Sequence, residues 1–590
     1  MNTKWLFKDA PNLETVDALK KEMNVSEVVA YMLVQRGITD FDAAKSFFRG
    51  SLKALHDPFL MKGMDRAVAR VNKAIAEEEK ILIYGDYDVD GTTAIALVYG
   101  FLSQYTSNIA YYIPDRYDEG YGVSEKGIKN AKKEGYSLVI TLDCGIKANE
   151  KVDLANSLAI DMIICDHHTP GNEIPNAIVL DPKRKDCEYP YKELSGCGVG
   201  FKLLQGLTSA NQWDEVELFK TLDLLAISIA ADLVPVTGEN RLLSQYGLKQ
   251  LNQHTRLGID VMLNLAKKEK PLSFTDIVFT IAPRINAAGR IDDAKKAVKL
   301  LTSQDKEEVR SIAKEIQEFN DERKALDKEI TEHALEKIAA DNQYTDKCTT
   351  VVYDHTWHKG VIGIVASRLI EKHYRPTIVM TQAEDGETWT GSARSIKGID
   401  MYEVLDKCSA FLEKFGGHYY AAGLTLKTEH LSRFENAFEK EVQKRIGSET
   451  LIPEQIIEKE LPFNQLFNIA ESIYELPRLM RVLKQFEPHG PENMKPLFVA
   501  RNVYAHDAKL LKGEHLKMKV YQPDFQKHID AIFFKSPTSL AIVQNGPFDM
   551  VFTLEENTFR GKTTPQLMVK DLRPTDADFE NINEYAVNLK

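Results

Sequence analysis

The stretch Ile81–Thr93, ILIYGDYDVDGTT, decides the fold class of this 590-residue chain. It opens with an apolar run, which is typical of a buried strand in a parallel sheet. Three carboxylates, Asp86, Asp88 and Asp90, follow at alternate positions before Gly91. Because open α/β sheets bind ligands at the C-terminal ends of their strands, this edge is predicted to bind Mg²⁺ or Mn²⁺ through hard oxygen ligands. A solvated acidic turn is the simpler alternative for this motif taken alone.

Strand and helix signals alternate from Ala76 to about Leu180. The predicted strands are ILIYG, IAYYIP, SLVITLD and DMIIC, and the predicted helices between them span Ala94–Leu102 and Glu125–Lys133. Such alternation indicates parallel strands joined by right-handed crossovers. A further helical stretch is expected at Phe219–Ala231.

Further metal-type ligands end other apolar runs. Asp143 closes SLVITLD, Asp166-His167-His168 follows DMIIC, and Asp232 ends LLAISIAAD. A parallel sheet brings such groups to one edge, where carboxylates with an imidazole suit Mn²⁺ or Mg²⁺. Two ions about 3.5 to 4 Å apart can clamp both oxygens of an in-line displacement at phosphorus. The alternative for the histidine pair alone is a hydrogen-bonded loop.

A long amphipathic helix is predicted between Thr302 and Ala340, where apolar residues recur at helical spacing. Thr302 and Asp305 resemble a capping box at its start. Because the helix lies between two α/β segments, we expect it to connect two domains. Asn320 and Arg323 lie one turn apart on it, and surface positions are the favoured interpretation for both.

Strand and helix signals resume at TTVVYD and run to about Gly447, and shorter strands after Leu451 predict an all-β domain. Between Arg501 and Tyr521 there are five basic and two acidic residues, a local charge of +3. Basic grooves with aromatic side chains hold single strands without reading sequence, and a solvated strand face is the alternative. The basic residues expected to line the groove are Lys509, Lys512, Lys517 and Lys519.

The overall composition of the chain excludes few classes of function. The net charge of −12 neither supports nor excludes a nucleic-acid substrate, because local patches decide such binding. No segment offers the roughly 18 apolar residues that a membrane helix needs, and the first residues lack a signal-peptide core. The six cysteines show no C-x-x-C spacing. We therefore expect a cytoplasmic protein that does not bind membranes.

The motifs in combination resemble a known family. DYDVDG at 86–91, TLDCG around Asp143 and Asp166-His167-His168 are similar to the first three motifs of the DHH phosphoesterase superfamily. Segments similar to the bacterial RecJ-type exonucleases and their DHHA1 domain cover nearly the whole chain. They are GCGVGFKL (196–203), ADLVPVTGENR (231–241), IAPRINAAGR (281–290), HKGVIGIVASRL (358–369), GSARS (391–395) and GGHYYAAG (416–423).

This resemblance implies an α/β architecture that ends in a β-barrel. The expected order is an N-terminal helical segment (1–70), a parallel-sheet DHH catalytic domain (71–301), a connector helix (302–343), a smaller α/β DHHA1 domain (344–450) and an OB-fold nucleic-acid-binding domain (451–590). One departure is visible, because the chain reads PHGPENMKP at 488–496 where the family pattern reads PFGxGNxxP. Glu492 there replaces a glycine that favours positive φ, so this turn is expected to be altered.

The resemblance also implies roles for individual residues. Asp143 is expected to bridge two ions and His168 to contact the scissile phosphate, with Asp86 as a weaker catalytic member that orients its neighbours. The implied metal ligands are Asp88, Asp90, Asp143, His167 and Asp232.

A second implied set binds substrate phosphates, and it is expected to hold the 5′ end that is removed. Arginine suits this task because its guanidinium binds two phosphate oxygens at once. Arg284 could equally brace the fold. The set comprises Ser392, Arg394, Gly416, Gly417, His418, Arg284, Asn286 and Arg290.

The implied activity is metal-dependent 5′-to-3′ removal of mononucleotides from single-stranded DNA in repair and recombination. Two divalent ions, Mn²⁺ or Mg²⁺, are the implied cofactors, and a RecQ-type helicase and a single-strand-binding protein are implied partners. Two alternatives stay open. One is a DHH phosphoesterase that acts on short oligoribonucleotides or nucleotide phosphates, and the other is a catalytically silent replication scaffold.

Overall fold

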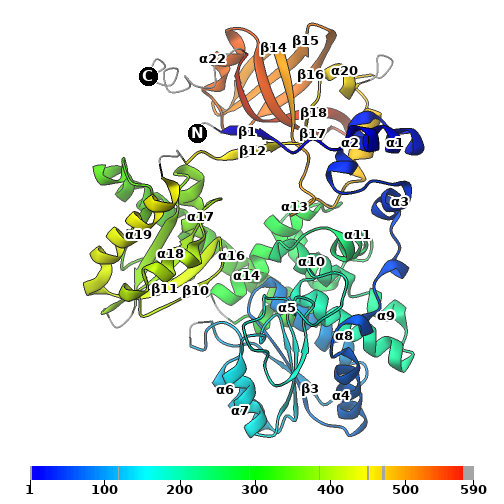
Figure 1. Ribbon diagram of the computed structural model, residues 1–590, viewed down its shortest axis with the longest axis vertical. Helices are drawn as coiled ribbons and strands as arrows, with labels where there is room; N and C mark the ends of the chain where they lie inside the picture. The colour runs from blue at the N-terminus through cyan, green and yellow to red at the C-terminus, as the bar shows by residue number, and fades with distance from the viewer. Residues whose placement is uncertain are drawn as a thin grey trace. The chain divides into compact units, whose positions relative to one another are not determined.

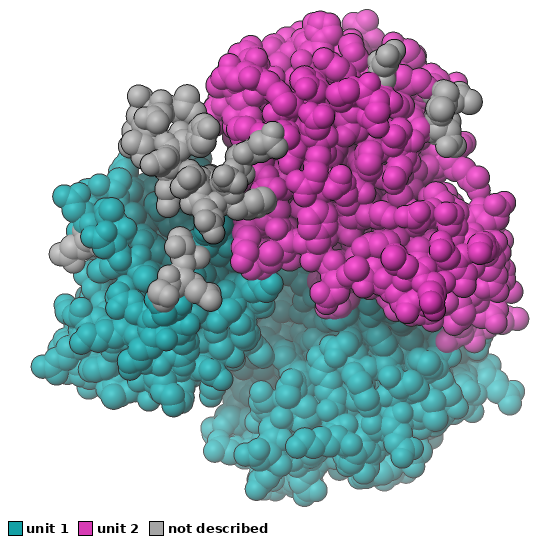
Figure 2. Space-filling view, turned by 45° about the horizontal axis from the view of Figure 1, so that its top comes forward, with its two compact units in different colours: residues 1, 55–452 teal, residues 2–54, 453–590 magenta. Residues whose placement is uncertain are grey.

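The computed structural model describes residues 3–116, 118–291, 293–383, 386–447, 451–467 and 472–575. The chain forms two compact units, which Figure 2 distinguishes by colour. Leu55–Ile452 make the first unit, and Asn2–Ala54 join Pro453–Lys590 in the second. The N-terminal helices therefore fold with the C-terminal part of the chain. No helix among the described residues combines the length and apolar character needed to span a bilayer.

The first unit contains the predicted parallel sheet, which has five strands, one more than the four predicted from the sequence. Its strands in spatial order are β3 (Ile109–Tyr112), β2 (Ile81–Gly85), β4 (Leu138–Leu142), β5 (Asp161–Cys165) and β6 (Ile178–Leu180). Because β2 pairs with β3 on one side and β4 on the other, the connections run in opposite directions from β2. Such a switch point leaves a crevice at the carboxyl ends of the strands.

Helices surround this sheet (Figure 1). Two of them, α6 and α7, share a buried apolar cluster with β2, β4 and β5. The helices are α4 (Met64–Ala76), α5 (Val89–Leu102), α6 (Glu125–Glu134), α7 (Asn149–Ser157), α8 (Gly196–Asn211), α9 (Glu215–Phe219), α10 (Leu222–Asp232), α11 (Gly238–Gln253), α12 (Leu257–Leu265), α13 (Phe274–Asp276), α14 (Ala282–Ile291) and α15 (Lys295–Thr302).

Helix α5 begins five residues earlier than its predicted start at Ala94. Asp88 is its N-cap and accepts a hydrogen bond from the Gly91 backbone N–H at 3.0 Å. An aspartate at this position satisfies a backbone donor that the helix itself leaves unpaired. Asp90 and Gly91 therefore lie in the first helical turn and not on a strand edge.

The predicted connector is α16 (Lys306–Ala340). The capping box expected at its start is wrong, because Thr302 ends α15 and bonds the Val298 carbonyl oxygen, whereas Asp305 itself caps α16. Asn320 is fully buried, so the surface interpretation is wrong for this residue. A polar side chain survives such burial only with hydrogen-bonding partners.

The rest of the first unit is a smaller α/β domain, in which α17–α19 pack against a mixed sheet (Figure 1). Among the described strands of this sheet, β7 and β8 pair in parallel and the other neighbours pair antiparallel. The strands in spatial order are β10 (Lys414–Gly417), β11 (Ala421–Lys427), β9 (Thr388–Arg394), β8 (Thr377–Gln382) and β7 (Thr350–Tyr353), and the helices are α17 (Ile362–Lys372), α18 (Met401–Lys407) and α19 (Leu431–Ile446).

The second unit is built on a closed β-barrel of the OB type, which confirms the predicted fold. Strand β14 pairs with both β15 and β17 and so closes the sheet. The strands are β13 (Lys459–Glu460), β14 (Phe498–Leu511), β15 (His515–Gln522), β16 (Phe525–Phe533), β17 (Phe548–Phe559) and β18 (Lys562–Pro574), and short helices α20 (Phe463–Leu466), α21 (Arg478–Lys484) and α22 (Ser539–Gln544) accompany them.

The N-terminal elements add to this barrel. Leu19, Val28 and Met32 are buried in the same apolar cluster as Phe498 and Phe548. Strand β1 (Lys4–Phe7) pairs in parallel with β12 (Glu454–Ile457), and the helices are α1 (Leu13–Met23), α2 (Glu27–Gln35) and α3 (Phe41–Arg49).

The turn before β14 forms despite the substitution at Glu492. Glu492 itself adopts φ of 60°, the left-handed conformation that glycine favours, at a cost of about 1 to 2 kcal/mol. Asn493 holds the turn by donating to the carbonyl oxygens of Phe486 and Pro488 at 2.8 and 2.9 Å. The missing glycine therefore does not prevent this turn from forming.

Candidate active site

Five of the sequence-predicted metal ligands come from four segments that meet at one end of the parallel sheet. Asp143 directly follows β4, and His167 lies two residues beyond β5. Asp232 is the last residue of α10, and Asp88 and Asp90 belong to the start of α5. Helices as well as strand ends therefore supply this site.

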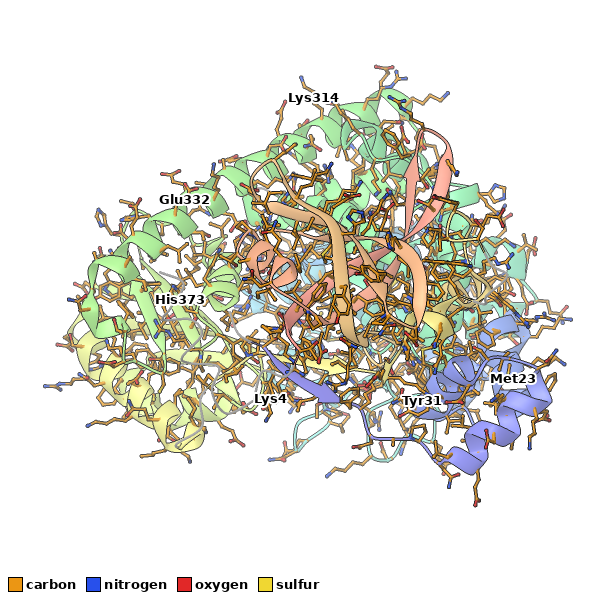
Figure 3. All side chains as sticks on the ribbon, turned by 90° about the horizontal axis from the view of Figure 1, so that it is seen from above. Lys4, Met23, Tyr31, Lys314, Glu332 and His373 are labelled. Carbon is orange, nitrogen blue, oxygen red and sulfur yellow. The ribbon has the colours of Figure 1, made fainter. Side chains whose placement is uncertain are left out.

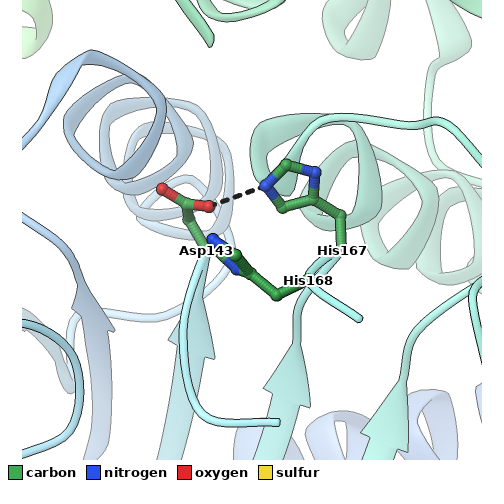
Figure 4. A group of neighbouring side chains, drawn as sticks. All are labelled: Asp143, His167 and His168. Atoms are coloured by element: carbon green, nitrogen blue, oxygen red, sulfur yellow. Dashed lines mark ion pairs between the residues drawn. The ribbon is translucent and has the colours of Figure 1, made fainter. Parts of the chain in front are cut away.

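The imidazole of His167 lies at the centre of the carboxylates. Its Nε2 is 3.1 Å from Asp143 Oδ1, 3.6 Å from Asp232 Oδ2 and 3.8 Å from Asp90 Oδ2, and Figure 4 shows the contact with Asp143. Neither ring nitrogen has a hydrogen-bond partner among the described residues. Burial lowers the pKa of His167 to about 4. The ring is therefore neutral at pH 7, which is the form that ligates metals.

The carboxylates destabilise one another in their charged forms. Burial, followed by the charges of Asp90 and Asp88, raises the pKa of Asp143 well above its usual range. The same causes raise the pKa of Asp232. Crowded carboxylates around an unpartnered neutral imidazole fit a centre for divalent cations with oxygen and nitrogen ligands, such as Mn²⁺ or Mg²⁺.

Asp90 is held by groups that the sequence did not identify. It accepts hydrogen bonds from the backbone N–H groups of Gly196 and Cys197 at 2.7 and 2.9 Å and from Ser228 Oγ at 2.6 Å. These partners fix its orientation, as hydrogen bonds to ligating carboxylates do at metal sites. The glycine-rich segment at 196–200 was a usable signal for the two backbone donors, whereas nothing in the sequence pointed to Ser228.

Gly196 also sets how closely α8 approaches Asp143. A Cβ atom on Gly196 would lie 2.5 Å from Asp143 Cβ and 2.7 Å from its Oδ1. Asp143 itself has φ of 60°, a left-handed conformation that aspartate tolerates better than most residues. The start of α8 and the Asp143 carboxylate therefore fit only without a side chain at position 196.

Asp86 and Asp88 differ in surroundings. Asp86 is fully buried, its Oδ1 lies 3.4 Å from the Gly122 N–H, and its Oδ2 has no partner among the described residues. Asp88 is half-buried and caps α5. Burial raises the pKa of both groups, with further contributions from Asp88 on Asp86 and from Asp90 on Asp88.

His168 is oriented by Asp166, whose role the sequence left unassigned. The Asp166 Oδ1 atom lies 2.7 Å from His168 Nδ1 and accepts the His167 and His168 backbone N–H groups, while Oδ2 accepts from Ile146 N at 2.9 Å. Burial disfavours a charged imidazole, but the bond with Asp166 outweighs it and raises the pKa of His168. Hydrogen bonds likewise outweigh burial at Asp166 and lower its pKa to about 2.

An Asp166→Asn variant is therefore expected to shift the pH dependence of activity. Because the pKa of His168 is raised, its imidazolium persists to higher pH than that of a free histidine and is lost as pH rises through the raised pKa. Removing the Asp166 charge lowers the pKa of His168, so the alkaline limb of the pH–rate profile should move to lower pH, with about a 10- to 100-fold loss of activity. pH–rate profiles of the wild type and the variant at saturating metal check this prediction. It would be contradicted if the alkaline limb did not move in Asp166→Asn and was also still present in His168→Gln.

A pocket of about 580 Å³ opens beside His168. Tyr121, His418 and the residues from Cys144 to Lys151, which include the first residues of α7, line it. The Tyr121 hydroxyl lies 3.4 Å from His168 Nε2, and the His418 ring stacks on His168 at 5.9 Å between centroids. The pocket is therefore bounded by both α/β domains of the first unit.

The second α/β domain contributes Arg394 and Ser392 from β9. The Arg394 guanidinium bonds Ser392 Oγ at 3.1 Å and the Ala393 carbonyl oxygen at 2.9 Å. Burial, then the charge of Arg116, lowers the pKa of Arg394. A Cβ atom on Gly363, in the first turn of α17, would lie 2.8 Å from Ser392 Oγ. The start of α17, the Ser392 hydroxyl and the Arg394 guanidinium therefore lie next to one another.

Gly416 and Gly417, two members of the predicted phosphate-binding set, lie in a strand and not in a turn. Gly416 and Gly417 form the exposed end of β10, and the turn to β11 comprises His418, Tyr419 and Tyr420. Pairing with Gly423 and Ala422 across the hairpin extends the strand through both glycines. The hairpin still carries His418 to His168.

The three polar residues of α14 differ in their contacts. Arg284 Nε bonds Gln317 Oε1 at 2.9 Å and its Nη1 bonds the Thr280 carbonyl oxygen at 2.6 Å, so it braces α14 against α16. Arg290 Nη1 bonds the Gly360 carbonyl oxygen at 3.0 Å and so reaches the loop before α17. Asn286 is half-buried.

The predicted basic groove lies on the barrel, in the second unit. Tyr504 and Tyr521 are paired across β14 and β15, and their rings stack at 5.6 Å between centroids. Lys519 is paired with His506 and Lys517 with Lys509. Lys512 lies in the turn between these strands and is exposed. Because alternate residues of a strand share a face, Lys519 lies on the same face as Tyr521, whereas Lys509 and Lys517 are paired farther along the two strands.

Three family models match the chain. They are the DHH family N-terminal domain over residues 80–229, the DHHA1 domain over 346–444 and the RecJ OB domain over 474–571. The chain is 36% identical to the single-stranded-DNA-specific exonuclease RecJ of Bacillus subtilis strain 168, over 95% of this chain and 70% of that protein. It is 33% identical to the Escherichia coli K12 protein of the same name, over 87% and 91%.

Solved structures of RecJ proteins also match the chain. RecJ from Thermus thermophilus in complex with Mn²⁺ matches with a TM-score of 0.82 and 26% identity, covering 97% of this chain and 80% of that one. An exonuclease RecJ bound to manganese matches with a TM-score of 0.58 and 30% identity, covering 67% of this chain and 97% of that one.

Proposed function

Because the chain belongs to the RecJ family of single-stranded-DNA-specific exonucleases, we propose that it is a metal-dependent 5′-to-3′ exonuclease that releases 5′-mononucleotides from single-stranded DNA during repair and recombination. The observation that carries this proposal is the convergence of Asp90, Asp143 and Asp232 on the neutral His167 ring. Phosphodiester hydrolysis with two divalent ions, Mn²⁺ or Mg²⁺, is the chemistry that this ligand set supports.

In this proposal, two divalent cations would be held by Asp88, Asp90, Asp143, His167 and Asp232. When bound, the cations lower the pKa of a coordinated water and neutralise charge on the departing oxygen. Asp86 supports the loop that carries Asp88. The bond with Asp166 favours the protonated form of His168. In this form His168 is proposed to donate to the scissile phosphate and to stabilise the negative charge that develops there.

The 5′ end of the strand is proposed to bind at Arg394 and Ser392, with His418 beside it. Arg394 is half-buried, and no carboxylate lies within ion-pair distance of it among the described residues. A guanidinium removed from water without a counter-charge favours binding of an anion. A terminal phosphate supplies that charge, and Gly416 and Gly417 let the hairpin end approach it closely. Arg290 and Asn286 are proposed to contact the adjoining backbone.

Arg394→Ala is expected to lower kcat/KM on a 5′-phosphorylated strand about 100-fold and to lower it much less on a 5′-hydroxyl strand. The reason is that only the phosphorylated end loses a bidentate, charge-assisted contact. Parallel assays on the two strands measure this, with Arg433→Ala, an exposed arginine on α19, as the matched control. Equal losses on both ends would assign Arg394 a structural role.

The barrel face with Tyr504, Tyr521 and Lys519 is proposed to bind longer strands. Stacked rings offer sequence-independent platforms for bases, and the lysines offer charge for the backbone. Cutting the chain after about Gly447 would not test this cleanly, because α1 and α2 pack in the barrel's apolar cluster. Point changes on the face leave that cluster intact.

One substrate panel tests the proposed function. End-labelled single-stranded DNA, duplex DNA, short RNA and pyrophosphate are incubated with the full chain and Mn²⁺ or Mg²⁺. Rapid release of 5′-mononucleotides from the single strand is expected. Preference for short RNA or pyrophosphate would support a small-substrate phosphoesterase instead, and no hydrolysis of any substrate would support a replication scaffold.

Partners and location follow from the same proposal. A RecQ-type helicase would supply single strands, and a single-strand-binding protein would coat them. The cytoplasm is the proposed location, because all six cysteines are free thiols, as is usual in a reducing compartment.

A further inference from the structure

Two backbone segments adjoin the candidate metal site without containing any of its proposed ligands. The segment 191–195 leads into α8, whose first two backbone N–H groups bond Asp90 at 2.7 and 2.9 Å. The segment 233–237 follows directly on Asp232, the last residue of α10. The positions of the two segments therefore decide how Asp90 and Asp232 face His167.

The segment after Asp232 begins with an unfavourable backbone conformation. Leu233 has φ of 58°, in the left-handed region that costs free energy for a residue with a branched side chain. Its side chain is 62% exposed, so packing of this side chain does not hold the turn. Such a conformation persists only where surrounding contacts fix it.

Asn240, in the first turn of α11, joins the two segments. Its side chain is fully buried. Its Nδ2 donates to the carbonyl oxygen of Glu193, which lies before α8, and to that of Pro235, which follows Asp232, the latter bond measuring 3.0 Å. An amide nitrogen has two hydrogens to donate, so it can bridge two carbonyl oxygens. One side chain thus ties together the backbone on both sides of the site.

Tyr191 makes a second connection between the same segments. Its hydroxyl donates to the Pro235 carbonyl oxygen at 3.2 Å and lies 3.1 Å from Thr237 Oγ1. A Cβ atom on Gly238 would lie 2.7 Å from the Tyr191 ring, so the ring packs directly on the backbone where α11 begins. The bridge at Asn240 is therefore supported from the side of α8.

The start of α11 is itself fixed against α8 by a buried ion pair. Glu239 Oε1 lies 2.7 Å from Lys202 Nζ, and neither side chain is more than 4% exposed. The other carboxylate oxygen of Glu239 accepts from the Tyr189 hydroxyl at 2.5 Å. Because separating a buried pair leaves an uncompensated charge, α11 keeps its place on α8. Asn240, the next residue, is thus presented to both segments in one position.

We propose that Asn240 is a positioning residue for the metal centre. By bonding both segments, it holds the backbone donors of Asp90 and the end of α10 at the spacing that lets Asp90 and Asp232 face His167 before a cation binds. This inference rests on the proposed function, because the site that Asn240 prepares is the proposed metal site. Ligands that are already held in place need less ordering when a cation binds, so the cation binds more tightly.

Binding of Mn²⁺ to the full, metal-free chain tests this without catalysis, with free Mn²⁺ measured by electron paramagnetic resonance. Asn240→Leu has a side chain of similar size but no donor, and it is expected to weaken Mn²⁺ binding about tenfold or more. Tyr191→Phe keeps the ring on Gly238 and removes one of the two bonds to the Pro235 carbonyl oxygen. It is expected to weaken Mn²⁺ binding about threefold.

Asn252→Leu is the matched control on the same helix. Asn252 Nδ2 also donates to two carbonyl oxygens, those of Leu248 and Leu272, both at 3.0 Å. It lies twelve residues beyond Asn240, about 18 Å along the helix axis. We expect Asn252→Leu to lower the thermal midpoint and to bind Mn²⁺ like the wild type. Glu332→Gln controls for weak binding by surface carboxylates, because Glu332 is exposed on α16 (Figure 3).

Wild-type affinity for Mn²⁺ in Asn240→Leu would overturn the inference. If that variant does not fold, wild-type affinity in Tyr191→Phe would overturn it. So would equal weakening of Mn²⁺ binding by Asn240→Leu and Asn252→Leu, because that pattern marks a general loss of stability. Absence of Mn²⁺ binding by the wild type would refute the proposed metal centre, and this inference with it.

Discussion

An Asp143→Asn variant is expected to fold and to lose about a thousandfold or more of its strand-degrading activity with either Mn²⁺ or Mg²⁺. Asp143 follows β4 directly, and its Oδ1 is the carboxylate oxygen nearest to His167 Nε2, at 3.1 Å. Removing its charge removes one of the carboxylates that would hold the cations. Asparagine is preferable to alanine here because it tolerates the φ of 60° at this position.

Stability gives an independent reading of the same variant. The raised pKa of Asp143 means that the metal-free folded state binds protons more tightly than the unfolded state does. Its free energy of unfolding should therefore fall as pH rises above the usual carboxylate range. Asp143→Asn should reduce that fall, which thermal melts in EDTA across pH would measure.

Asp153→Asn, an exposed change on α7, serves as the control for both measurements. It should retain activity, Mn²⁺ binding and the wild-type dependence of stability on pH. Digestion of single strands by Asp143→Asn at the wild-type rate would refute the assignment of Asp143 as a metal ligand.

Gly196→Ala is expected to reduce activity about 100-fold or more without removing any functional group. The added Cβ would lie 2.5 Å from Asp143 Cβ and 2.8 Å from its Cα, so α8 or Asp143 must move. Any such shift also lengthens the bond between Gly196 N and Asp90, now 2.7 Å. A displacement of about 1 Å at a catalytic centre can cost about 100-fold in rate.

Gly198→Ala provides a matched control in the same turn of α8. Its added Cβ would meet Leu194 Cβ at 3.3 Å and Ser195 Oγ at 3.4 Å, contacts that small side-chain shifts accommodate. We expect Gly198→Ala to keep most of its activity. Single-turnover assays at saturating metal compare the rates of the two variants. If Gly196→Ala and Gly198→Ala lose activity equally, the close approach of α8 at Gly196 does not position Asp143.

Sequence patterns located much of the candidate site because strand ends are recognisable. The runs before Asp86, Asp143 and Asp166 are short, apolar and bounded by turn residues, and parallel pairing of β2, β4 and β5 brings their ends together. Periodicity likewise predicted α16, although not its N-cap. Capping depends on which residue leaves the helical conformation, and Thr302 still belongs to α15.

Other features depend on contacts between residues far apart in the chain. Ser228 donates a hydrogen bond to Asp90, which lies 138 residues away in the chain. Asp166 can orient His168 because both residues lie directly beyond the end of β5. Arg284 was assigned to substrate and also braces α14 against Gln317. Asn320 was interpreted as exposed, but tertiary packing buries it fully.

The sequence by itself determined the fold class, the family and the residue types of the site, because strand periodicity and motif spacing are local properties of the chain. The tertiary structure alone decided which side chains face one another. Asp90 and Asp232 reach His167 from helices, and the absence of a side chain at Gly196 lets α8 pack closely against Asp143. The joining of the first 54 residues to the barrel was also decided there. Burial and hydrogen-bond partners depend on packing between distant segments, and no local pattern encodes them.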